Sequence, residues 1–352
     1  MAERMVGLRA TPKPPLERIA PPLTARVIKA TAVLAGFVVS IFFTYLAVRG
    51  LDWAQFRSTI AHSNLWWLAP AFVVLMAGMT LRAVRWRLLF PPELRPPLPA
   101  VFRALLIGQF FNNVLPGRPG EALRVVTLYQ ETKTSRTVAL GTAVSERLYD
   151  VIVLLVVFFV AVPWLPHVDW VRRAGILAGL LCAGLGALLA VLAIWDVKPI
   201  LWALRPFSRL PGLAPENVER IATGLVVGLA AMRRARMALP ALVVSFAAIL
   251  VITLSYWLVT FAVGFHLSFG AAVLVMVATN LAMVIPSSPA AIGVFEAATV
   301  VALRTFGVPH ADALGYGVIL HALNSIPFIA IGLALLPRHG LKALRKTQAE
   351  AV

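Results

Sequence analysis

Residues 108–124 most constrain the fold, because they place helix-breaking residues inside a strongly apolar chain. Pro116 and Pro119 lack the amide proton that a helix needs, and Gly117 and Gly120 weaken a helix further. The helix must therefore break here. Within a bilayer, broken backbone is tolerated only where protein or a wet cavity surrounds it. Many transporters build their substrate sites from such breaks, so the segment predicts a polar site inside a membrane.

The composition supports a membrane protein. Of the 352 residues, 60% are hydrophobic and only 13% are charged, whereas a soluble chain is about a quarter charged. The net charge of +17 does not indicate nucleic-acid binding, because the basic residues lie at the ends of apolar segments, where they set topology. Phosphate-loop and metal-binding motifs are missing from the sequence, and Cys182 is its only cysteine. We therefore expect no cofactor, no metal and no disulfide within one chain.

The apolar segments predict an all-α polytopic membrane protein. Six of them approach the ~20 residues that cross a hydrocarbon core, namely residues 27–48, 65–81, 138–162, 174–194, 239–263 and 313–336. Two further segments, residues 101–129 and 271–303, are interrupted by proline and glycine. Each arm of these two segments is too short to cross comfortably, so we interpret both as re-entrant broken hairpins.

The basic residues predict which ends face the cytoplasm. With six full spans and two hairpins, all the basic loops lie on one side, as the positive-inside rule requires. One of these loops follows the second span and contains Arg82, Arg85, Arg87 and Arg95. An alternative with eight full spans also fits much of the chain, but it puts the longest basic loop outside.

This topology divides the chain into three parts. Residues 1–25 and 338–352 are predicted to be basic cytoplasmic tails, and residues 26–337 a transmembrane domain. Residues 196–237 of that domain are expected to form a cytoplasmic loop with an amphipathic helix on the anionic leaflet. We expect a multi-pass protein of a bacterial inner membrane with both termini in the cytoplasm.

The two breaks resemble each other. Pro116 and Pro119 have the same spacing as Pro286 and Pro289, and in both cases an asparagine precedes the prolines while a glycine and a glutamate follow them. The hairpins enter from opposite sides in the topology above, which favours the inverted repeat of many transporters. The flanking spacings differ, so two unrelated proline kinks are the alternative.

Charged residues surround the first break. Arg118 lies in the turn, and Glu121 and Arg124 begin the returning helix three residues apart, where they can pair. The start of a helix presents free N–H groups that favour an anion. Arg118 together with this helix end predicts a phosphate site. The alternative is an internal salt bridge that neutralises the turn.

A second charged cluster lies within the third predicted span. A charge at the bilayer centre costs ~2.5–3.5 kcal/mol, so Glu146, Arg147 and Asp150 must be paired or hydrated. Glu146 and Asp150 share a helix face, and Arg147 can pair with Asp150. The cluster predicts a polar cavity, unless the helix starts earlier and leaves the motif at the membrane interface.

Glu296 is the lone acid of the second hairpin, three residues after Gly293. It could take a proton, bind a cationic group, or cap the start of the helix. We interpret Asn280 and Asn324 as interhelical hydrogen-bonding residues. His321, one turn before Asn324, is interpreted as a packing histidine, with a proton relay as the alternative.

Taken together, these motifs resemble the transmembrane, flippase-like region of lysylphosphatidylglycerol synthases and the stand-alone membrane proteins that share it. The motifs occupy residues 113–124, 146–150 and 286–296. The resemblance covers residues 29–336, essentially the whole membrane part. The family often has a Pro-Gly-Gly-type turn in the third motif, where this chain has Ala290 and Ala291.

The resemblance implies the translocation of lipids between leaflets, in the bifunctional members of aminoacylated phosphatidylglycerol. We expect no aminoacyl-transferase domain after Leu336, and therefore no synthase activity. The leading hypothesis is a flippase for an anionic phospholipid or a lipid-linked phosphate, passive or ion-coupled. The alternatives are a membrane enzyme acting on a lipid phosphate and a non-catalytic accessory subunit of a cell-envelope synthase.

The hypothesis assigns no catalytic residue, and a partner synthase or a homo-oligomer is compatible with it. The predicted substrate-binding residues are Asn113, Arg118, Glu121, Arg124, Glu146, Arg147, Asp150 and Glu296. The predicted turn-forming residues are Pro116, Pro119, Gly120, Pro286, Pro289 and Gly293.

Overall fold

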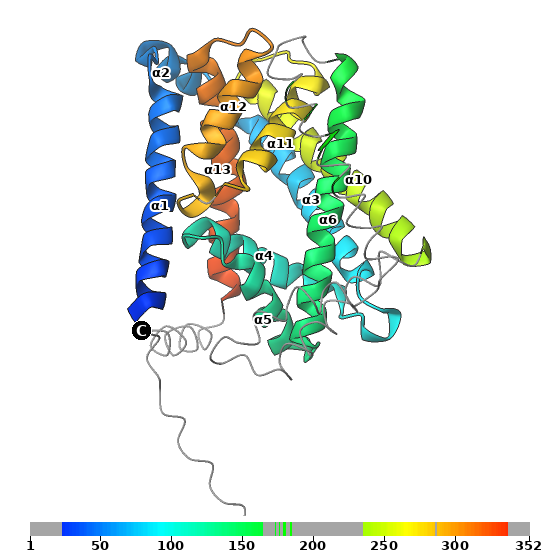
Figure 1. Cartoon of the computed structure of the whole chain (residues 1–352). Coiled ribbons are helices and arrows are strands. Elements are labelled where there is room, and N and C mark those ends of the chain that lie inside the picture. The colour runs from blue at the N-terminus through cyan, green and yellow to red at the C-terminus, as the bar shows by residue number, and fades with distance from the viewer. Residues whose placement is uncertain are drawn as a thin grey trace, which may run out of the picture.

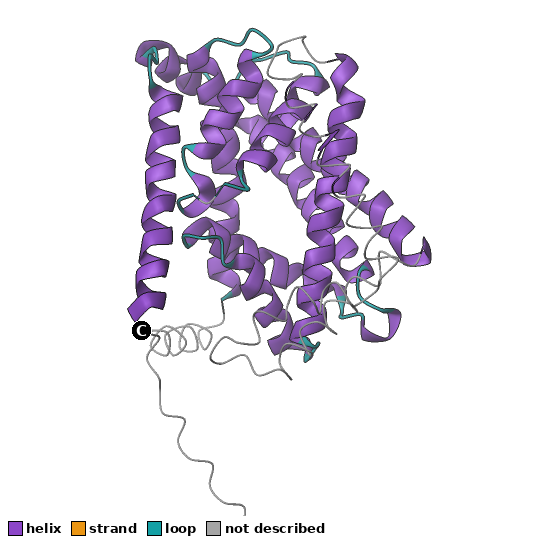
Figure 2. Cartoon of the chain, in the orientation of Figure 1, coloured by secondary structure: helices purple, strands orange, loops and turns teal. Residues whose placement is uncertain are grey.

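The computed structural model describes residues 23–164, 235–285 and 287–336, with five single positions between residues 173 and 184. Within these ranges the chain forms helices joined by short turns, without a strand (Figure 1, Figure 2). The predicted all-α class is confirmed for this part of the chain.

Three long helices have the length and apolar character of a membrane span. They comprise Leu65–Leu88, Arg236–Ala262 and His310–Leu335. The first combines the short helix η1, Leu65–Trp67, with α3, Leu68–Leu88. The others belong to α10, Ala235–Ala262, and α13, His310–Leu335. α3 and α10 pack along each other. Together with α13, they also pack against the segments that contain the two predicted breaks.

A fourth candidate span is the pair of α1, Leu23–Val48, and α2, Trp53–Ala61, which bends by 92° at its break. The bend has a local cause. Gly50 has a φ of +69°, a left-handed conformation that commonly ends a helix. Asp52 then caps α2 by accepting a hydrogen bond from the backbone N of Gln55 at 3.0 Å. α2 is therefore turned across the end of α1 (Figure 1).

Two helical hairpins lie among the long helices. The first consists of α4, Leu98–Val114, and α5, Gly120–Thr132. The second consists of α11, Phe269–Ala282, and α12, Val294–Arg304. The two helices of each hairpin pack against each other, so the chain reverses at each break.

The hairpins approach the middle of the molecule from opposite ends. Figure 1 shows α4 and α5 in its lower half and α11 and α12 in its upper half, and α13 packs against both α4 and α12. All four hairpin helices are shorter than the ~20 residues of a span. The two predicted breaks are confirmed, while the number of full spans and the inverted repeat stay predictions.

Shorter elements complete the described chain. η2, Pro92–Leu94, leads from α3 into α4. α6, Arg136–Ala161, continues into η3, Val162–Trp164. The 26 residues of α6 give a length of about 39 Å at 1.5 Å per residue, long enough to cross a bilayer. η5, Pro289–Ala291, lies in the second break.

The predicted spans agree with α1, α6, α10 and α13 to within four residues at each end. The second predicted span is wrong at its end. It stops at Leu81, but α3 continues to Leu88 and therefore includes Arg82 and Arg85. Arginine is a good helix former, so the helix persists where the apolar run stops. The first predicted tail extends too far, because residues 23–25 already belong to α1. The rest of both tails, residues 174–194 apart from four single positions, and nearly all of residues 196–237 fall outside the described residues.

Two glycines determine how closely α4 and α5 approach. A Cβ atom on Gly120 would lie 1.9 Å from the carbonyl O of Gly108 and 2.5 Å from Oδ1 of Asn112. A real Cβ atom does not come so near to backbone, so residue 120 must be glycine for this packing. The close approach places the first turn of α5, which carries Glu121 and Arg124, directly against α4.

Candidate functional site

The turn of the first hairpin is built from left-handed backbone. Gly117 has a φ of +74° and Arg118 a φ of +53°, a conformation that is uncommon for a residue with a side chain. α5 then begins at Gly120, whose backbone N donates a hydrogen bond of 2.8 Å to Oδ1 of Asn112. The predicted helix start after the prolines is confirmed, with Asn112 holding its first N–H group.

A buried arginine joins α3 to α6. Arg85 donates hydrogen bonds to Glu146 at 2.6 Å and to Asp150 at 2.5 Å. The side chains of Arg85 and Glu146 are only 1% exposed. One cation thus bridges two carboxylates one helical turn apart, which confirms that Glu146 and Asp150 share a face of α6.

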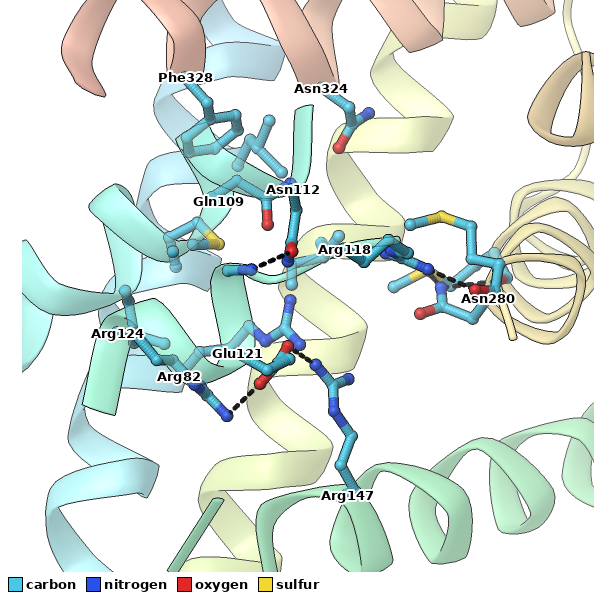
Figure 3. Close-up of a pocket in the computed structure, with 18 of the residues that line it drawn as sticks. Arg82, Gln109, Asn112, Arg118, Glu121, Arg124, Arg147, Asn280, Asn324 and Phe328 are labelled. Carbon is cyan, nitrogen blue, oxygen red and sulfur yellow. Dashed lines mark hydrogen bonds and ion pairs between the residues drawn. The ribbon is translucent and has the colours of Figure 1, made fainter. Parts of the chain in front are cut away.

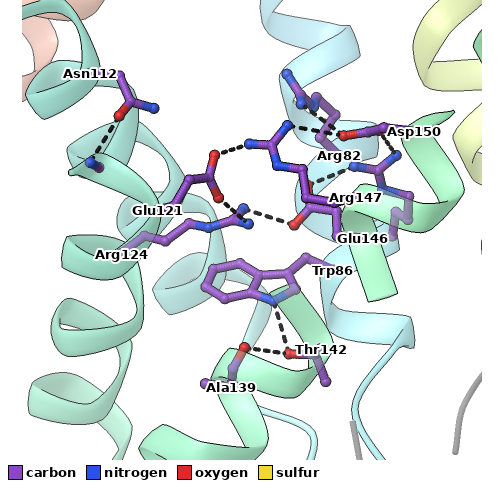
Figure 4. A network of polar contacts seen from close by, with 12 residues as sticks. Arg82, Trp86, Asn112, Glu121, Arg124, Ala139, Thr142, Glu146, Arg147 and Asp150 are labelled. Atoms are coloured by element: carbon purple, nitrogen blue, oxygen red, sulfur yellow. Dashed lines mark hydrogen bonds and ion pairs between the residues drawn. The ribbon is translucent and has the colours of Figure 1, made fainter. Parts of the chain in front are cut away.

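Two further arginines close this arrangement into a ring. Arg124 on α5 forms ion pairs with Glu121 at 2.6 Å and with Glu146 at 2.8 Å. Arg147 on α6 pairs with Glu121 and, at 3.3 Å, with Asp150. The predicted pairs between Glu121 and Arg124 and between Arg147 and Asp150 are both confirmed. Figure 4 shows the resulting contacts between α5 and α6.

We call this arrangement the charge ring, formed by Arg85, Glu146, Arg124, Glu121, Arg147 and Asp150. Each member pairs with two others, and cations alternate with carboxylates around it. Three positive and three negative charges give a formal charge of zero. The ring therefore gives the acids of α6 the ion-pair partners that its apolar residues cannot provide. It also links α3, α5 and α6.

An aromatic side chain supports one side of the ring. The guanidinium carbon of Arg124 lies 4.6 Å from the ring centroid of Trp86, a cation–π contact. Trp86 is fully buried, and its Nε1 donates a hydrogen bond to Oγ1 of Thr142 at 3.1 Å. Trp86 is thereby fixed beneath the guanidinium of Arg124 (Figure 4).

A cavity of about 330 Å³ opens beside the charge ring, between the two hairpins (Figure 3). Its charged lining residues are Arg82, Arg118, Glu121, Arg124 and Arg147. Its uncharged polar lining includes Gln109, Asn112, Asn280 and Asn324. Its apolar lining includes Leu75, Met79, Leu105, Ile252, Met276 and Phe328. The cavity is therefore both cationic and amphipathic.

Two of the cavity arginines lie outside the charge ring. Arg82 is on α3, with its Nη2 3.6 Å from Oδ2 of Asp150, and Arg118 lies in the turn of the first hairpin. Because the ring is already neutral in formal charge, Arg82 and Arg118 leave the site with a formal surplus of two positive charges, even though Arg82 shares Asp150 with the ring. Such a surplus in a partly desolvated space favours an anion.

Arg118 also connects the two hairpins. Its Nη1 donates a hydrogen bond to the carbonyl O of Met283, which follows the last turn of α11. Figure 3 shows the Arg118 side chain reaching from the first turn toward the second hairpin beside Asn280. The two breaks, 165 residues apart in sequence, therefore meet at this cavity.

Glu296 lies apart from the cavity. Its Oε2 accepts a hydrogen bond from the backbone N of Gly293 at 2.7 Å, and its Oε1 contacts Nδ1 of His321. The capping interpretation is confirmed. The structure does not bring Glu296 to the arginines, because α12 directs it toward α13.

The structure brings together six of the eight predicted substrate-binding residues, and it leaves Asn113 and Glu296 outside that group. Arg118, Glu121, Arg124, Glu146, Arg147 and Asp150 come together in the ring and the cavity. Asn113 does not line the cavity. Its neighbour Asn112 does, because successive residues of a helix point about 100° apart. Pro286 is outside the described residues.

Sequence reasoning missed Arg82 and Arg85, which it assigned to a loop. The available signal was the charge count of the third predicted span. Glu146 and Asp150 inside an apolar helix need more cations than Arg147 provides, and the arginines after residue 81 were the nearest unassigned source. In the described ranges, no group of three or more His, Cys, Asp or Glu side chains is arranged to hold a metal ion.

Comparisons with known proteins identify the family. A family model described as the lysylphosphatidylglycerol synthase TM region matches residues 33–332. No curated protein and no solved structure matches the chain. The matched residues include both hairpins, the charge ring and all three motifs of the sequence. The chain belongs to the lysylphosphatidylglycerol synthase TM region family.

Proposed function

We propose that this protein moves an anionic phospholipid, or a lipid-linked phosphate, between the leaflets of a bacterial inner membrane. The observation that carries the proposal is the surplus of Arg82 and Arg118 at an amphipathic cavity next to a neutral ring. Arginine suits this role, because its planar guanidinium binds phosphate oxygens through two parallel hydrogen bonds.

The remaining lining fits the rest of a lipid. Leu75, Ile252 and Phe328 give the cavity an apolar side, which suits the glycerol backbone and the start of the acyl chains. A cavity of about 330 Å³ is at the small end of ligand pockets. It accommodates a headgroup while the chains stay in the bilayer.

Arg124 adds a further point of contact. It lines the cavity with only 3% of its surface exposed, and its Nε has no hydrogen-bond partner among the described residues. Because this atom is buried, a phosphate oxygen would reach it only after the neighbouring side chains had moved. Such a contact would leave the ion pairs of Arg124 with Glu121 and Glu146 in place.

We propose transport without covalent chemistry, by movement of the hairpins around the bound headgroup. Several transporter folds bind substrate at broken helices and alternate access by rocking one bundle against another around that site. The contact between Arg118 and Met283 joins the two turns in the present conformation. Opening on one side requires this contact to break.

The test is leaflet exchange in liposomes that contain the purified protein. Fluorescent phosphatidylglycerol and a polyprenyl-phosphate analogue are compared with fluorescent phosphatidylcholine. We expect Arg118→Ala and Arg82→Gln each to reduce exchange of the anionic lipids about 10- to 100-fold, because a hydrogen bond to a charged group contributes about 1.5–3 kcal/mol. Arg103→Ala is the control, since Arg103 is half-exposed and pairs with Glu131 away from the cavity.

The two variants separate binding from hinge effects. Arg118 contacts the second hairpin and Arg82 does not, so loss in Arg118→Ala alone would assign the arginine to the movement and contradict the phosphate site. Normal exchange by both variants would overturn the proposal. Chemical conversion of the lipid, detected by mass spectrometry, would favour an enzyme. The absence of both exchange and conversion in folded protein would favour an accessory subunit.

A further inference from the structure

The contact between Glu296 and His321 places two ionisable groups in the membrane part of the chain, away from the arginine cavity. Their side chains are 12% and 11% exposed, and the His321 ring lies 4.8 Å from that of Phe295. Ionisable residues inside a membrane domain are costly and commonly mark ion or proton pathways. The role of this pair is not explained by lipid-phosphate binding, because neither member lines the cavity.

The pair is electrostatically separate from the charge ring. Ionisable residues on α12 and on the described elements packed against α12 and α13 are Arg26, Lys29, Tyr45, Arg57, Arg103, Arg236, Tyr256, Arg304, His310, Asp312 and Tyr316. α11 carries none. Where these side chains are described, none of them contacts Glu296 or His321. The three acids of the ring are each held ionised by adjacent arginines. Among the described side chains, no arginine plays that part for the Glu296–His321 pair.

The pair is attached to the turn that meets Arg118. Glu296 caps the backbone N of Gly293 at 2.7 Å. On the other side of the same turn, the backbone N of Ser288 donates to Oγ of Ser40 on α1 at 2.8 Å. The second hairpin is thus held by α1, by α13 through the pair, and by Arg118. A change in the charge of the pair acts on one of these three attachments.

The pair is also linked to the cavity through α13. His321, Asn324 and Phe328 are spaced by three and four residues, so they lie along one face of the helix. Asn324 and Phe328 line the cavity. A shift of α13 against α12 at the pair would therefore also move Asn324, which lines the lipid site one helical turn further along.

We infer that the Glu296–His321 pair is the proton-binding site that couples proton movement to lipid movement, an inference that rests on the proposed function. With Glu296 ionised and His321 neutral the pair carries one negative charge, and one proton makes it neutral. The proton belongs to the pair and not to either residue. A phosphodiester lipid carries one negative charge, so one proton and one lipid move together without net charge.

The experiment uses liposomes with fluorescent phosphatidylglycerol and an imposed pH gradient of about one unit. For one proton per lipid, the wild-type protein should shift the leaflet distribution about tenfold, because one pH unit corresponds to a factor of ten in equilibrium. A potassium-diffusion potential should not shift it, since the proton and the lipid together are neutral. In Glu296→Gln and His321→Asn the leaflet ratio should fall to about one.

His310→Gln is the matched control. His310 lies on the same helix, is partly buried, and bonds the carbonyl O of Ala47 through Nε2 at 2.7 Å. We expect this variant to keep the response to the pH gradient. If Glu296→Gln, His321→Asn and His310→Gln all lost the response, the cause would be general damage to the packing of α13. That result would overturn the assignment to the pair.

Proton binding is also measured without transport. An infrared pH titration of the wild-type protein should show a protonation change, in the carboxyl or imidazole bands, that Glu296→Gln and His321→Asn both remove. Absence of that change, or lipid exchange that ignores the pH gradient, would overturn the inference and leave the proposed function standing. Absence of exchange for every lipid, with the protonation change present, would instead count against the proposed function.

Discussion

Arg85 of α3 and Glu146 of α6 form an ion pair of 2.6 Å in which each side chain is only 1% exposed. The two residues are 61 positions apart in sequence. Taking two charges out of water is expensive, and the energy is recovered only if both stay paired. The pair therefore makes the contact between α3 and α6 intolerant of a change on one side.

Removing one charge from this pair should destabilise the protein strongly. Glu146→Gln leaves Arg85 and Arg124 facing a neutral group, and breaking a buried pair costs about 3–5 kcal/mol. Thermal unfolding in detergent would measure the effect. Arg103→Ala is the comparison, because its half-exposed pair with Glu131 contributes at most about 1 kcal/mol. Equal shifts in the melting temperature for both variants would contradict the burial argument.

The close contact of α4 and α5 predicts that Gly120→Ala is poorly tolerated. The new methyl group would lie 1.9 Å from the carbonyl O of Gly108, so the helices would have to separate and disturb the charge ring. We expect a marked loss of folded protein by size-exclusion chromatography. Gly117→Ala is the control. No atom lies within 4 Å of its new Cβ, and only its φ of +74° costs about 1–2 kcal/mol.

The second turn should be stabilised by a glycine. Ala290 has a φ of 57°, which costs a residue with a Cβ atom about 1–2 kcal/mol and costs glycine little. Ala290→Gly should therefore raise the unfolding temperature, with a gain of up to about 1 kcal/mol after the greater chain entropy of glycine is counted. Ala298→Gly, within α12, should instead lower stability by about 0.5–1 kcal/mol. A lower unfolding temperature for both variants would show that the turn is not strained.

The hairpins give a direct test of topology. If the first hairpin is re-entrant, Arg95 before it and Lys133 after it lie on the same side of the membrane. If it crosses fully, they lie on opposite sides. Single cysteines at these positions, in a Cys182→Ala background, should therefore react alike with a membrane-impermeant thiol reagent in intact cells. Opposite labelling would favour the alternative with eight spans.

The local parts of the site were predictable from sequence. Proline and glycine broke the helices at the expected positions, and the pairs Glu121–Arg124 and Arg147–Asp150 follow from helical spacing alone. These interactions depend only on neighbours in the chain. The same reasoning offered a helix cap as one of three interpretations of Glu296, although Glu296 was also predicted to bind substrate.

The long-range parts were not predictable. Periodicity does not show which cation reaches Glu146, and Arg85 looked like a topology signal because it follows an apolar run. The choice between Asn112 and Asn113 depends on the direction of one side chain about the axis of α4. The pairing of Glu296 with His321 requires α12 and α13 to be placed against each other, which no single segment specifies.

The closed form of the charge ring has an evolutionary consequence. Because every member pairs with two others, no single substitution can exchange one charge for its opposite without leaving two neighbours unmatched. Drift at these six positions would have to proceed through correlated changes on three helices at once. Relatives that have altered one position should therefore show compensating changes at the adjoining ones, so the ring would diverge as a unit or not at all.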